Sequence, residues 1–361
     1  EILEASPDRI APFCRHYGIC GGCRMQHIAA GPYAAWKRGI VVTTLARAGL
    51  TPDVAALLPA HGEGRRRAVL HVKAAPGGLQ AGFMRAGTHD LITLDTCPVL
   101  VPALAEAPAL ARALGRPLAR LGKPMDVQLT ATEGGLDVDI RGPGKIDAAL
   151  RLELSALADR LDLARLSLHG DVIVERRLPL VAMGPAMVNA PPGGFLQATA
   201  AGEAALAALV QAGVGPARRV VDLFCGAGPF ALRLAAHAHV RAYDSDRPAI
   251  EALLRAARST PGLKPVTAET RDLFRRPLLP GEVEGMDAVV LDPARAGAEA
   301  QVRQLARVAA LARIVYVSCD PMSFARDAAI LVAAGYTLET VTPVDQFAWS
   351  AHVELVGVLS R

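Results

Sequence analysis

The sequence predicts an α/β protein whose C-terminal half forms a mainly parallel, doubly wound sheet and whose first half contributes a smaller, β-rich domain. Strand-like apolar runs such as RRVVDLF, MDAVVLD and RIVYVSC alternate with helical patterns beyond residue 194, as a parallel sheet requires. The Pro-Pro-Gly-Gly stretch at 191–194 interrupts both patterns and indicates a domain boundary. Before it, short strand-like segments around Gly-rich turns are typical of antiparallel strands.

The first half of the chain contains several distinct segments. Residues 1–25 form a cysteine-rich loop, and PYAAWKRGIVVTTLARAG has a helical pattern that ends at Gly49 after Arg47. Residues 65–95 have strand-like runs around a Pro-Gly-Gly turn, which predicts a hairpin or meander. Further short strands, such as MDVQLTAT and GLDVDIRG, and a helical stretch near 146–160 complete this half.

Length and composition indicate a folded, soluble protein. At 361 residues with 52% apolar and 20% charged residues, the chain can bury a substantial core, which excludes a disordered protein. No run of about 18 apolar residues is present, so no membrane-spanning helix and no membrane partner are expected. The first residues, EILEASPDRI, lack the basic and apolar segments of a signal peptide, which favours a cytoplasmic protein.

Basic residues are concentrated in the first third of the sequence. Residues 1–124 contain 15 Lys and Arg against 8 Asp and Glu, whereas the remaining chain contains 24 against 27. Such an asymmetry favours a polyanionic partner such as nucleic acid, because Lys and Arg neutralise phosphates. An ordinary solvated surface explains the same charges equally well.

Four of the six cysteines have a spacing typical of metal ligands. Six cysteines in a chain of this length are too few for a disulfide framework. The spacing Cys14-x5-Cys20-x2-Cys23, with Cys97 far downstream, supplies four thiolates, which suits either a [4Fe–4S] cluster or tetrahedral zinc. A metal held by all four would fasten the N-terminal loop to the β-rich domain.

A glycine turn follows the strand RRVVDLF. Gly226 and Gly228 allow the backbone to turn sharply and approach a ligand, and the helix expected to begin near Pro229 directs free N–H groups at the same space. Asp244 lies 18 residues beyond Gly226, a spacing suited to a carboxylate that binds ribose hydroxyls. These features indicate a nucleotide-binding turn. A plain structural turn is the alternative, because the third glycine of the usual pattern is absent.

Two further aspartates follow strand-like segments. Asp272 lies in ETRDLF, and Asp292 begins DPARAGA directly after the apolar run AVVL. Each alone is most often a turn or helix-cap residue. Together with Asp244 they place carboxylates after three successive strands, where a doubly wound sheet binds ligands.

Cys319 lies where the strand RIVYVS ends and a turn containing Pro321 begins. A structural cysteine usually faces the core from inside a strand, whereas a sulfur at a strand exit can face a substrate. Thiols with an ordinary pKa of about 8.5 are partly ionised at neutral pH and strongly nucleophilic. Position alone supports a catalytic role and a structural role equally. His352 and Glu354 fall two residues apart on a strand-like segment, so they are expected to face one side, and either could be a base or a simple strand residue.

With these motifs assembled, the chain resembles the RNA uracil-5-methyltransferase family, and most closely its iron–sulfur-containing bacterial 23S rRNA branch. The matching segments cover essentially the whole chain in the order of the family: FCRHYGICGGCRMQH, FLQATA, DLFCGAGPF, DPARAGA, SCDPMSFARD and DQFAWSAHVE. The resemblance implies a Rossmann-like S-adenosylmethionine methyltransferase domain with a smaller β-rich central domain that carries a [4Fe–4S] cluster. The predicted domains are the central domain over 1–25 and 59–194, a helical segment over 26–58 that packs on the catalytic domain, and the methyltransferase domain over 195–361.

The resemblance also implies a role for each matching residue. Cys319 corresponds to the nucleophile that adds to carbon 6 of uracil, and Glu354 to the carboxylate that removes the hydrogen from carbon 5. The target nucleotide must be unstacked from folded RNA, and Phe347 is a candidate for lining its pocket, with core packing as the alternative. The resemblance assigns five residues to the neighbourhood of the methyl donor: Gln197, Phe224, Asp244, Asp272 and Asp292. The glycine turn adds Gly226 and Gly228 to the predicted donor site.

For the metal, the resemblance favours one of the two open alternatives. It favours [4Fe–4S] over zinc at the four cysteines. The candidates for phosphate contacts near the first hairpin, with a solvated basic strand as the alternative, are Arg65, Arg66, Arg67 and Lys73.

The substrate expected from the resemblance is a uridine in 23S rRNA, methylated at carbon 5 by a monomeric enzyme. A tRNA uracil-5-methyltransferase and a non-catalytic iron–sulfur RNA-binding or assembly factor are the alternatives. Three residues depart from the family pattern, because Asn is common where this chain has Thr199, Pro229 and Asp320. The rRNA branch usually begins with an RNA-binding β-barrel, and EILEASPDR resembles only the segment that follows it, so the resemblance leads us to expect a barrel that is absent or truncated.

Overall fold

The computed structural model describes residues 2–361, which divide into two compact units. The first unit contains residues 2–29, Gly62–Val181 and Asn189–Ala200, and the second unit contains Ala30–His61, Ala182–Val188 and Ala201–Arg361. These limits differ from the predicted limits chiefly near residue 190, because the hairpin of β10 (Leu180–Met183) and β11 (Ala186–Asn189) is divided between the two units.

The second unit is built on a mixed nine-stranded sheet with the order β1-β17-β18-β16-β15-β12-β13-β14, in which β2 also pairs with β17. The five strands β12 to β16 are parallel, and β18 runs antiparallel between β16 and β17. Apolar strands separated by helices favour this arrangement, as the sequence predicted. The strands are β1 (Asp53–Val54), β2 (Leu58–Pro59), β12 (Arg219–Leu223), β13 (His239–Asp244), β14 (Val266–Thr270), β15 (Ala288–Leu291), β16 (Arg313–Ser318), β17 (Thr337–Asp345) and β18 (Glu354–Ser360).

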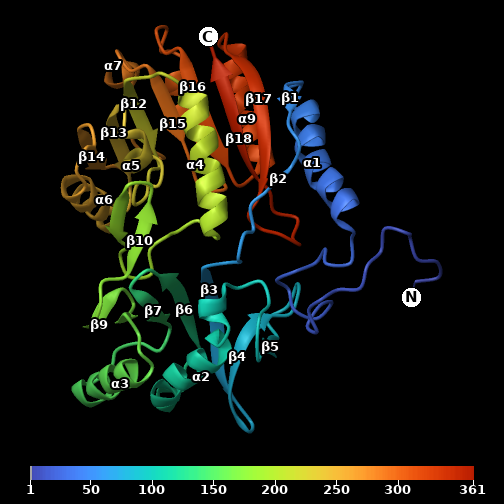
Figure 1. The fold of residues 1–361 in the computed structure, drawn as a ribbon, viewed down its shortest axis with the longest axis vertical. Helices are drawn as coiled ribbons and strands as arrows, with labels where there is room; N and C mark the ends of the chain where they lie inside the picture. Colours follow the sequence, from blue (N-terminus) through green and yellow to red (C-terminus); the bar gives the residue numbers. More distant parts are fainter. Residues whose placement is uncertain (1) are drawn as a thin grey trace. The chain divides into compact units, whose positions relative to one another are not determined.

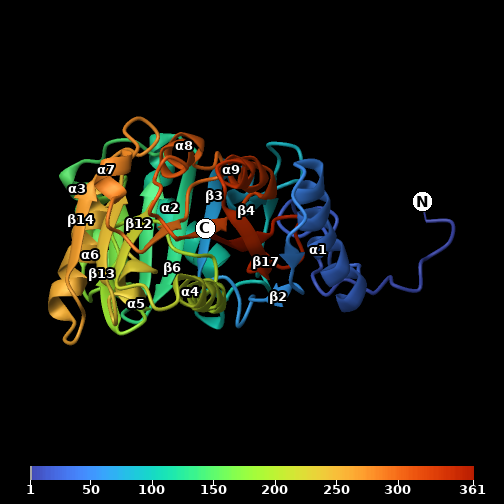
Figure 2. The ribbon, with the colours of Figure 1, turned by 90° about the horizontal axis from the view of Figure 1, so that it is seen from above.

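Helices cover both faces of this sheet, and Figure 2 shows α8 and α9 on one side and α4 on the other. Alternation along β16 explains how: Val315 lies against Gly213 of α4, whereas Tyr316 packs edge-on against Phe324 of α9. Both faces of β16 are therefore buried. The helices are α1 (Ala30–Arg47), α4 (Ala200–Val214), α5 (Ala231–Leu234), α6 (Arg247–Ser259), α7 (Pro280–Val283), α8 (Glu299–Leu305) and α9 (Pro321–Ala333).

The strand order defines the place where this sheet can bind a ligand. The chain continues from β12 to β13 on one side, and β15 lies on the other side of β12. Such a switch point opens a crevice at the carboxyl ends of the strands. Figure 1 shows the parallel strands β12, β13, β15 and β16 side by side in this unit.

The first unit contains a seven-stranded sheet with the order β5-β4-β3-β6-β7-β8-β9, antiparallel except between β7 and β8. Helix α2 was not predicted, although Ala107, Ala111, Leu114 and Leu118 recur at helical spacing and are buried. The elements are β3 (Arg67–Ala75), β4 (Gly78–Met84), β5 (Leu91–Thr93), η1 (Pro102–Leu104), α2 (Ala107–Leu118), η2 (Ala119–Leu121), β6 (Met125–Thr132), β7 (Gly135–Arg141), α3 (Ala148–Arg160), β8 (Arg165–Leu168) and β9 (Asp171–Glu175).

Among residues 2–361, no helix is both long enough and apolar enough to cross a membrane. The predicted cytoplasmic location and monomeric state stay predictions.

Candidate functional site

The glycine turn after β12 uses its two glycines for different purposes. Gly228 has φ +93°, and a Cβ added there would lie 2.4 Å from Cδ1 of Leu253 on α6. Gly226 has φ +51° but no atom within 4 Å of such a Cβ, so its outer side is open. Phe224 also has a positive φ, +62°, which a non-glycine residue rarely adopts outside functional sites. The turn is therefore packed on one side and accessible on the other.

Replacing Gly228 with alanine is expected to destabilise the second unit by about 1–3 kcal/mol, because the new methyl group overlaps Leu253. It should also weaken binding of the methyl donor that the sequence resemblance implies. The matched variant Gly226→Ala shares the positive φ but has free space, so it separates packing from backbone strain. Thermal unfolding and calorimetric donor binding measure the two effects. Equal losses in both variants would contradict the packing explanation.

Asp244 fastens the glycine turn to the end of β13. One carboxylate oxygen accepts the Gly226 N–H at 2.9 Å, and the other accepts the Asp246 N–H at 2.8 Å. Asp272 instead accepts the backbone N–H groups of Phe274 and Arg275 at 3.0 and 3.2 Å, as turn aspartates do. Both carboxylates thus shape loops at this edge of the sheet.

Carboxylates are crowded at the carboxyl ends of β12 and β15. Asp222 is 0% exposed, and burial raises its pKa to about 8. Desolvation, followed by the charges of Glu354, Asp222 and Asp244, raises the pKa of Asp292 well above its usual value. Groups so close together resist full ionisation. A cationic ligand would relieve this repulsion.

Cys319 follows β16 and precedes α9, whose first turn is capped by Asp320 through hydrogen bonds from the N–H groups of Met322 and Ser323. The thiol is half-buried. Burial, then the charges of Glu354 and Asp292, raises its pKa to about 11, although Arg295 acts in the opposite direction. Burial first, and then the neighbouring carboxylates, therefore disfavour the thiolate in the free protein.

Glu354 is the first residue of β18 and is 4% exposed. Burial raises the pKa of its carboxyl to about 7, opposed by a hydrogen bond from Gln346 and by the charge of Arg295. The Gln346 amide donates to Oε1 at 3.1 Å. A carboxyl group that titrates near neutrality can accept a proton from a substrate and later release it to water.

His352 does not share the environment of Glu354, although both were expected to face one side of a strand. His352 precedes β18 and is exposed, with its Nδ1 3.0 Å from Nη2 of Arg295. The expected alternation fails because the strand begins only at Glu354. Phe347, in the same loop, is half-buried, with its ring centroid 6.1 Å from that of His352.

Arg295 was missed as a site residue in the sequence. It lies three residues after Asp292 within DPARAGA and lowers the pKa of both Cys319 and Glu354. Arg295 could have been recognised in the sequence, because it follows the strand AVVL closely and the candidate carboxylate Asp292 lies at the end of the same strand.

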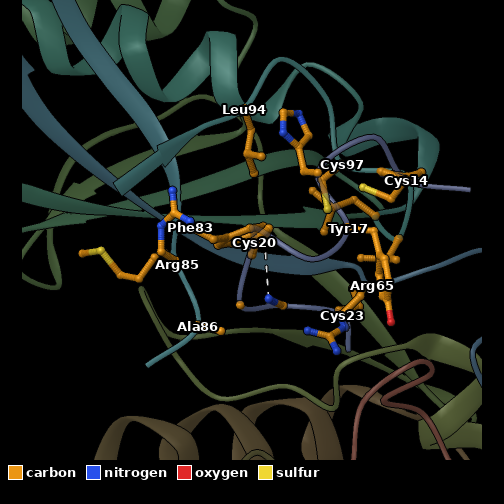
Figure 3. Close-up of a pocket in the computed structure, with 18 of the residues that line it drawn as sticks. Cys14, Tyr17, Cys20, Cys23, Arg65, Phe83, Arg85, Ala86, Leu94 and Cys97 are labelled. Atoms are coloured by element: carbon orange, nitrogen blue, oxygen red, sulfur yellow. Dashed lines mark hydrogen bonds between the residues drawn. The ribbon is translucent and has the colours of Figure 1, made fainter. Parts of the chain in front are cut away.

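The four N-terminal cysteines line one cavity of about 570 Å³ in the first unit, shown in Figure 3. The loop that carries three of them runs along β4, where the Gly21 N–H donates to the carbonyl of Met84 at 3.0 Å. A Cβ on Gly21 would lie 2.9 Å from that oxygen, so the close approach requires glycine. Cys97 approaches the cavity from the segment after β5.

These thiols are not arranged around a single ion. Among residues 2–361, no three His, Cys, Asp or Glu side chains are gathered closely enough to hold one metal ion. Zinc bound by four thiolates needs Zn–S distances of about 2.3 Å, so its ligands must converge on one point. Four half-buried thiols around a larger cavity suit a larger group better.

Comparison with known proteins places the chain among RNA methyltransferases. It is 48% identical over 360 residues to an uncharacterized RNA methyltransferase of Brucella suis, which covers 100% of this chain and 86% of that relative. It is 36% identical over 395 residues to the 23S rRNA (uracil(1939)-C(5))-methyltransferase of Halomonas elongata, covering 100% of this chain and 79% of the relative. The model of the tRNA (Uracil-5-)-methyltransferase family matches residues 266–361. The chain belongs to the RNA uracil-5-methyltransferase family.

A solved structure supports the methyltransferase fold for this family member. The tRNA (uracil-54, C5)-methyltransferase of Pyrococcus abyssi, in complex with S-adenosyl-L-homocysteine, has a TM-score of 0.78 and 22% sequence identity. The match covers 99% of this chain and 87% of that chain. The predicted α/β methyltransferase fold is therefore confirmed.

Not all residues predicted for this family lie in the second unit. Gln197 lies in the first unit and is 5% exposed, and its backbone carbonyl accepts a hydrogen bond from Arg66 at 3.1 Å. Its assignment to the methyl donor stays a prediction.

The residues predicted to contact RNA in this protein also lie in the first unit. Arg66 is 8% exposed, so little of it can reach a phosphate. Arg67 stacks over the exposed ring of Phe195 at 5.2 Å, and burial lowers its pKa. Arg65 lines the cysteine cavity, and Lys73 is half-buried on β3. Arg65, Arg67 and Lys73 stay candidates for RNA binding.

Proposed function

We propose that this protein transfers the methyl group of S-adenosylmethionine to carbon 5 of a uridine in 23S rRNA. The observation that carries the proposal is the register of the second sheet: β16 and β18 are antiparallel neighbours with Ser318 opposite Leu355, so Cys319 and Glu354 meet at one edge, and Asp292 follows the adjacent strand β15. A nucleophile and a base within reach of one another are what carbon 5 methylation requires. The relatives named above support the reaction class.

Each residue has a defined role in the proposed reaction. Cys319 thiolate forms a bond to carbon 6 of uracil, and the electrons of the 5,6 double bond move into an enolate. Carbon 5 then attacks the sulfonium methyl group, the methyl–sulfur bond breaks, and S-adenosylhomocysteine leaves. Glu354 takes the proton from carbon 5, the double bond re-forms, and the sulfur–carbon 6 bond breaks to release Cys319 thiolate.

Ionisation of Cys319 is the first requirement of this sequence. With a pKa of about 11, the thiol holds its proton in the free protein at neutral pH. Arg295 favours the thiolate, and the positive charge of the bound donor acts in the same direction. We therefore propose that donor binding lowers the pKa of the Cys319 thiol. The thiolate then adds to uracil only when the donor's methyl group is already in the site.

The crowded carboxylates suit a cationic donor. The sulfonium and ammonium groups of S-adenosylmethionine are both positive and would offset the repulsion among Asp222, Asp244 and Asp292. The open side of Gly226 leaves room for close approach of the nucleoside part, and Asp244 is the proposed partner of its ribose. Phe224 and Asp272 flank this region in the proposed site.

For the cysteine cavity we propose a [4Fe–4S] cluster held by Cys14, Cys20, Cys23 and Cys97. When bound, the cluster would supply a cross-link between segments more than 70 positions apart, and through it structural stability. Gln26 is 1% exposed, and its side-chain oxygen accepts the Cys14 N–H at 3.1 Å, which orients the cysteine loop. Zinc is the less favoured alternative.

Replacing Cys97 with serine is expected to abolish cluster binding and to lower the melting temperature of the protein. The free energy of metal binding contributes directly to folding when the ligands come from distant segments. Absorbance near 400 nm and iron analysis of anaerobically purified protein measure cluster content. Cys225→Ser controls for cluster content alone, because Cys225 lies outside this cavity in the second unit but is itself buried. Stoichiometric zinc without iron in the unmodified protein would reject the cluster.

The proposed substrate is tested by methylation of defined RNAs. Labelled S-adenosylmethionine, the protein and unmodified 23S rRNA are expected to yield 5-methyluridine, with transcribed tRNA as the parallel substrate. The 36% identity to the Halomonas elongata enzyme supports rRNA. Preferential methylation of tRNA would replace the substrate but keep the reaction, whereas RNA binding without donor binding would indicate a non-catalytic factor.

A further inference from the structure

The loop of residues 346–353, which joins β17 to β18 and leads directly into Glu354, has no regular secondary structure. Most of its residues are nevertheless buried or half-buried, and Gln346 and Val353 are 0% and 1% exposed. Within the loop, the backbone of Trp349 is left-handed, with φ +61°. Buried backbone groups outside helices and sheets need other partners. The contacts of this loop therefore decide where β18 begins and where Glu354, its first residue, lies.

Lys37 on α1 supplies three of these contacts. Its side chain is 0% exposed, and its Nζ donates to Asp345 Oδ1 at 2.5 Å, to the Phe347 carbonyl at 3.0 Å and to the His352 carbonyl at 2.6 Å. An ammonium group has three N–H donors, so these contacts use all of them. The partners lie at the end of β17, within the loop, and two residues before Glu354. One side chain thus ties both ends of the loop together.

Tyr33 lies one turn earlier on the same face of α1 and completes the attachment. Its hydroxyl donates to Asp345 Oδ2 at 2.9 Å and accepts the Trp349 N–H at 2.8 Å. The amide of the left-handed residue is therefore held as well. Both oxygens of Asp345 are engaged by α1, so the helix, the strand end and the loop form one polar network.

We infer that Lys37 is a positioning residue that holds Glu354 where it can reach the carbon 5 proton, an inference that rests on the proposed function. Gln346, next to Asp345, donates to Glu354 Oε1 at 3.1 Å, so the loop's shape and the carboxylate's orientation are linked. Neither Lys37 nor Asp345 belongs to the catalytic groups. A purely structural role would require only that the buried charge of Asp345 be neutralised.

The two roles predict different behaviour when both charges are removed. Lys37→Met alone leaves the buried carboxylate of Asp345 without its ammonium partner, so this variant is expected to unfold at lower temperature. The double variant Lys37→Met, Asp345→Asn removes the charge imbalance but leaves the Phe347 and His352 carbonyls without their lysine donor. A positioning role predicts that the double variant folds but still releases product slowly.

The test measures three quantities on unmodified and 5-fluorouridine RNA with labelled S-adenosylmethionine: turnover, the amount of covalent protein–RNA complex, and the label within it. The double variant is expected to turn over about 10–100-fold more slowly, as small misplacements of catalytic groups do, and to accumulate a methyl-labelled covalent complex on ordinary uridine RNA. It should form the 5-fluorouridine adduct normally, because addition and methyl transfer precede proton removal. Leu305→Ala, in the buried core at α8, controls for loss of stability.

Glu354→Gln serves as the reference for lost proton removal. A labelled complex with Glu354→Gln but not with the Lys37 double variant would overturn the inference and leave the proposed function intact. A loss of turnover that only matches the loss of stability in Leu305→Ala would also overturn it. If neither variant accumulates the complex while the unmodified protein methylates RNA, the role of Glu354 fails, and the inference fails with it.

Discussion

Replacing Cys319 with alanine is expected to abolish methyl transfer and to remove the covalent adduct with 5-fluorouridine RNA. The variant lacks the atom that bonds to carbon 6, and loss of a nucleophile in an enzyme lowers turnover by up to about 10⁶-fold. Methyl incorporation and denaturing gels of the protein–RNA complex measure the two effects. The fold should survive, because the side chain is only half-buried and alanine fits the same space.

Donor binding provides the control for the Cys319 variant. Calorimetry with S-adenosylmethionine is expected to give a similar affinity for Cys319→Ala and the unmodified protein, because the thiol reacts with uracil and not with the donor. Cys319→Ser tests the nucleophilicity of the sulfur specifically, since it keeps the approximate size of the side chain but replaces the sulfur with oxygen. An adduct that persists in the alanine variant would remove Cys319 from the reaction.

Replacing Glu354 with glutamine is expected to stop the reaction after methyl transfer. Glutamine keeps the shape of the side chain but cannot accept the carbon 5 proton, so the methylated RNA stays bonded to Cys319. General bases contribute roughly 10²–10⁴-fold to rate, and turnover should fall by about that factor. A labelled protein–RNA complex that resists denaturation is the diagnostic product. Normal release of 5-methyluridine by this variant would assign proton removal to another group.

The same substitution predicts a change in stability with pH. Burial raises the pKa of Glu354 from 4.5 to about 7, so the folded protein holds this proton more tightly than the unfolded chain. Its contribution to stability is fully present below pH 4.5 and is lost as pH rises through about 7, by up to about 3 kcal/mol. Glu354→Gln should therefore gain melting temperature relative to the unmodified protein between pH 5 and pH 8. A constant difference over that range would contradict a raised pKa.

Enzymatic activity should increase over the pH range in which the stability of the protein decreases. Glu354 must be ionised to accept a proton, so product release is expected to increase as pH rises from about 6 to 8. The conflict has a physical origin: the low dielectric surroundings that make the carboxylate a stronger base also make it costly to ionise in the fold.

The sheet of the second unit could be predicted because its determinants are local. Apolar strands, the glycines after β12 and the proline after Cys319 lie within short segments, so their periodicity and turn chemistry are visible in sequence. Helix α2 was missed although its apolar residues recur at helical spacing, because Pro108, Gly115 and Pro117 within it are usually helix breakers. The prediction that His352 and Glu354 face one side of a strand was also wrong, because the exact start of β18 depends on the preceding loop.

The sequence by itself determined which chemical groups lie at strand ends, because strand, turn and helix signals are short-range. It placed a thiol after β16, a carboxyl group at the start of the last strand, and four cysteines in the first 97 residues. Only the tertiary structure decided the protonation of Cys319 and Glu354 and the link between Lys37 and Asp345, 308 positions apart. Burial and through-space charge depend on groups that folding brings together, and no local pattern encodes them.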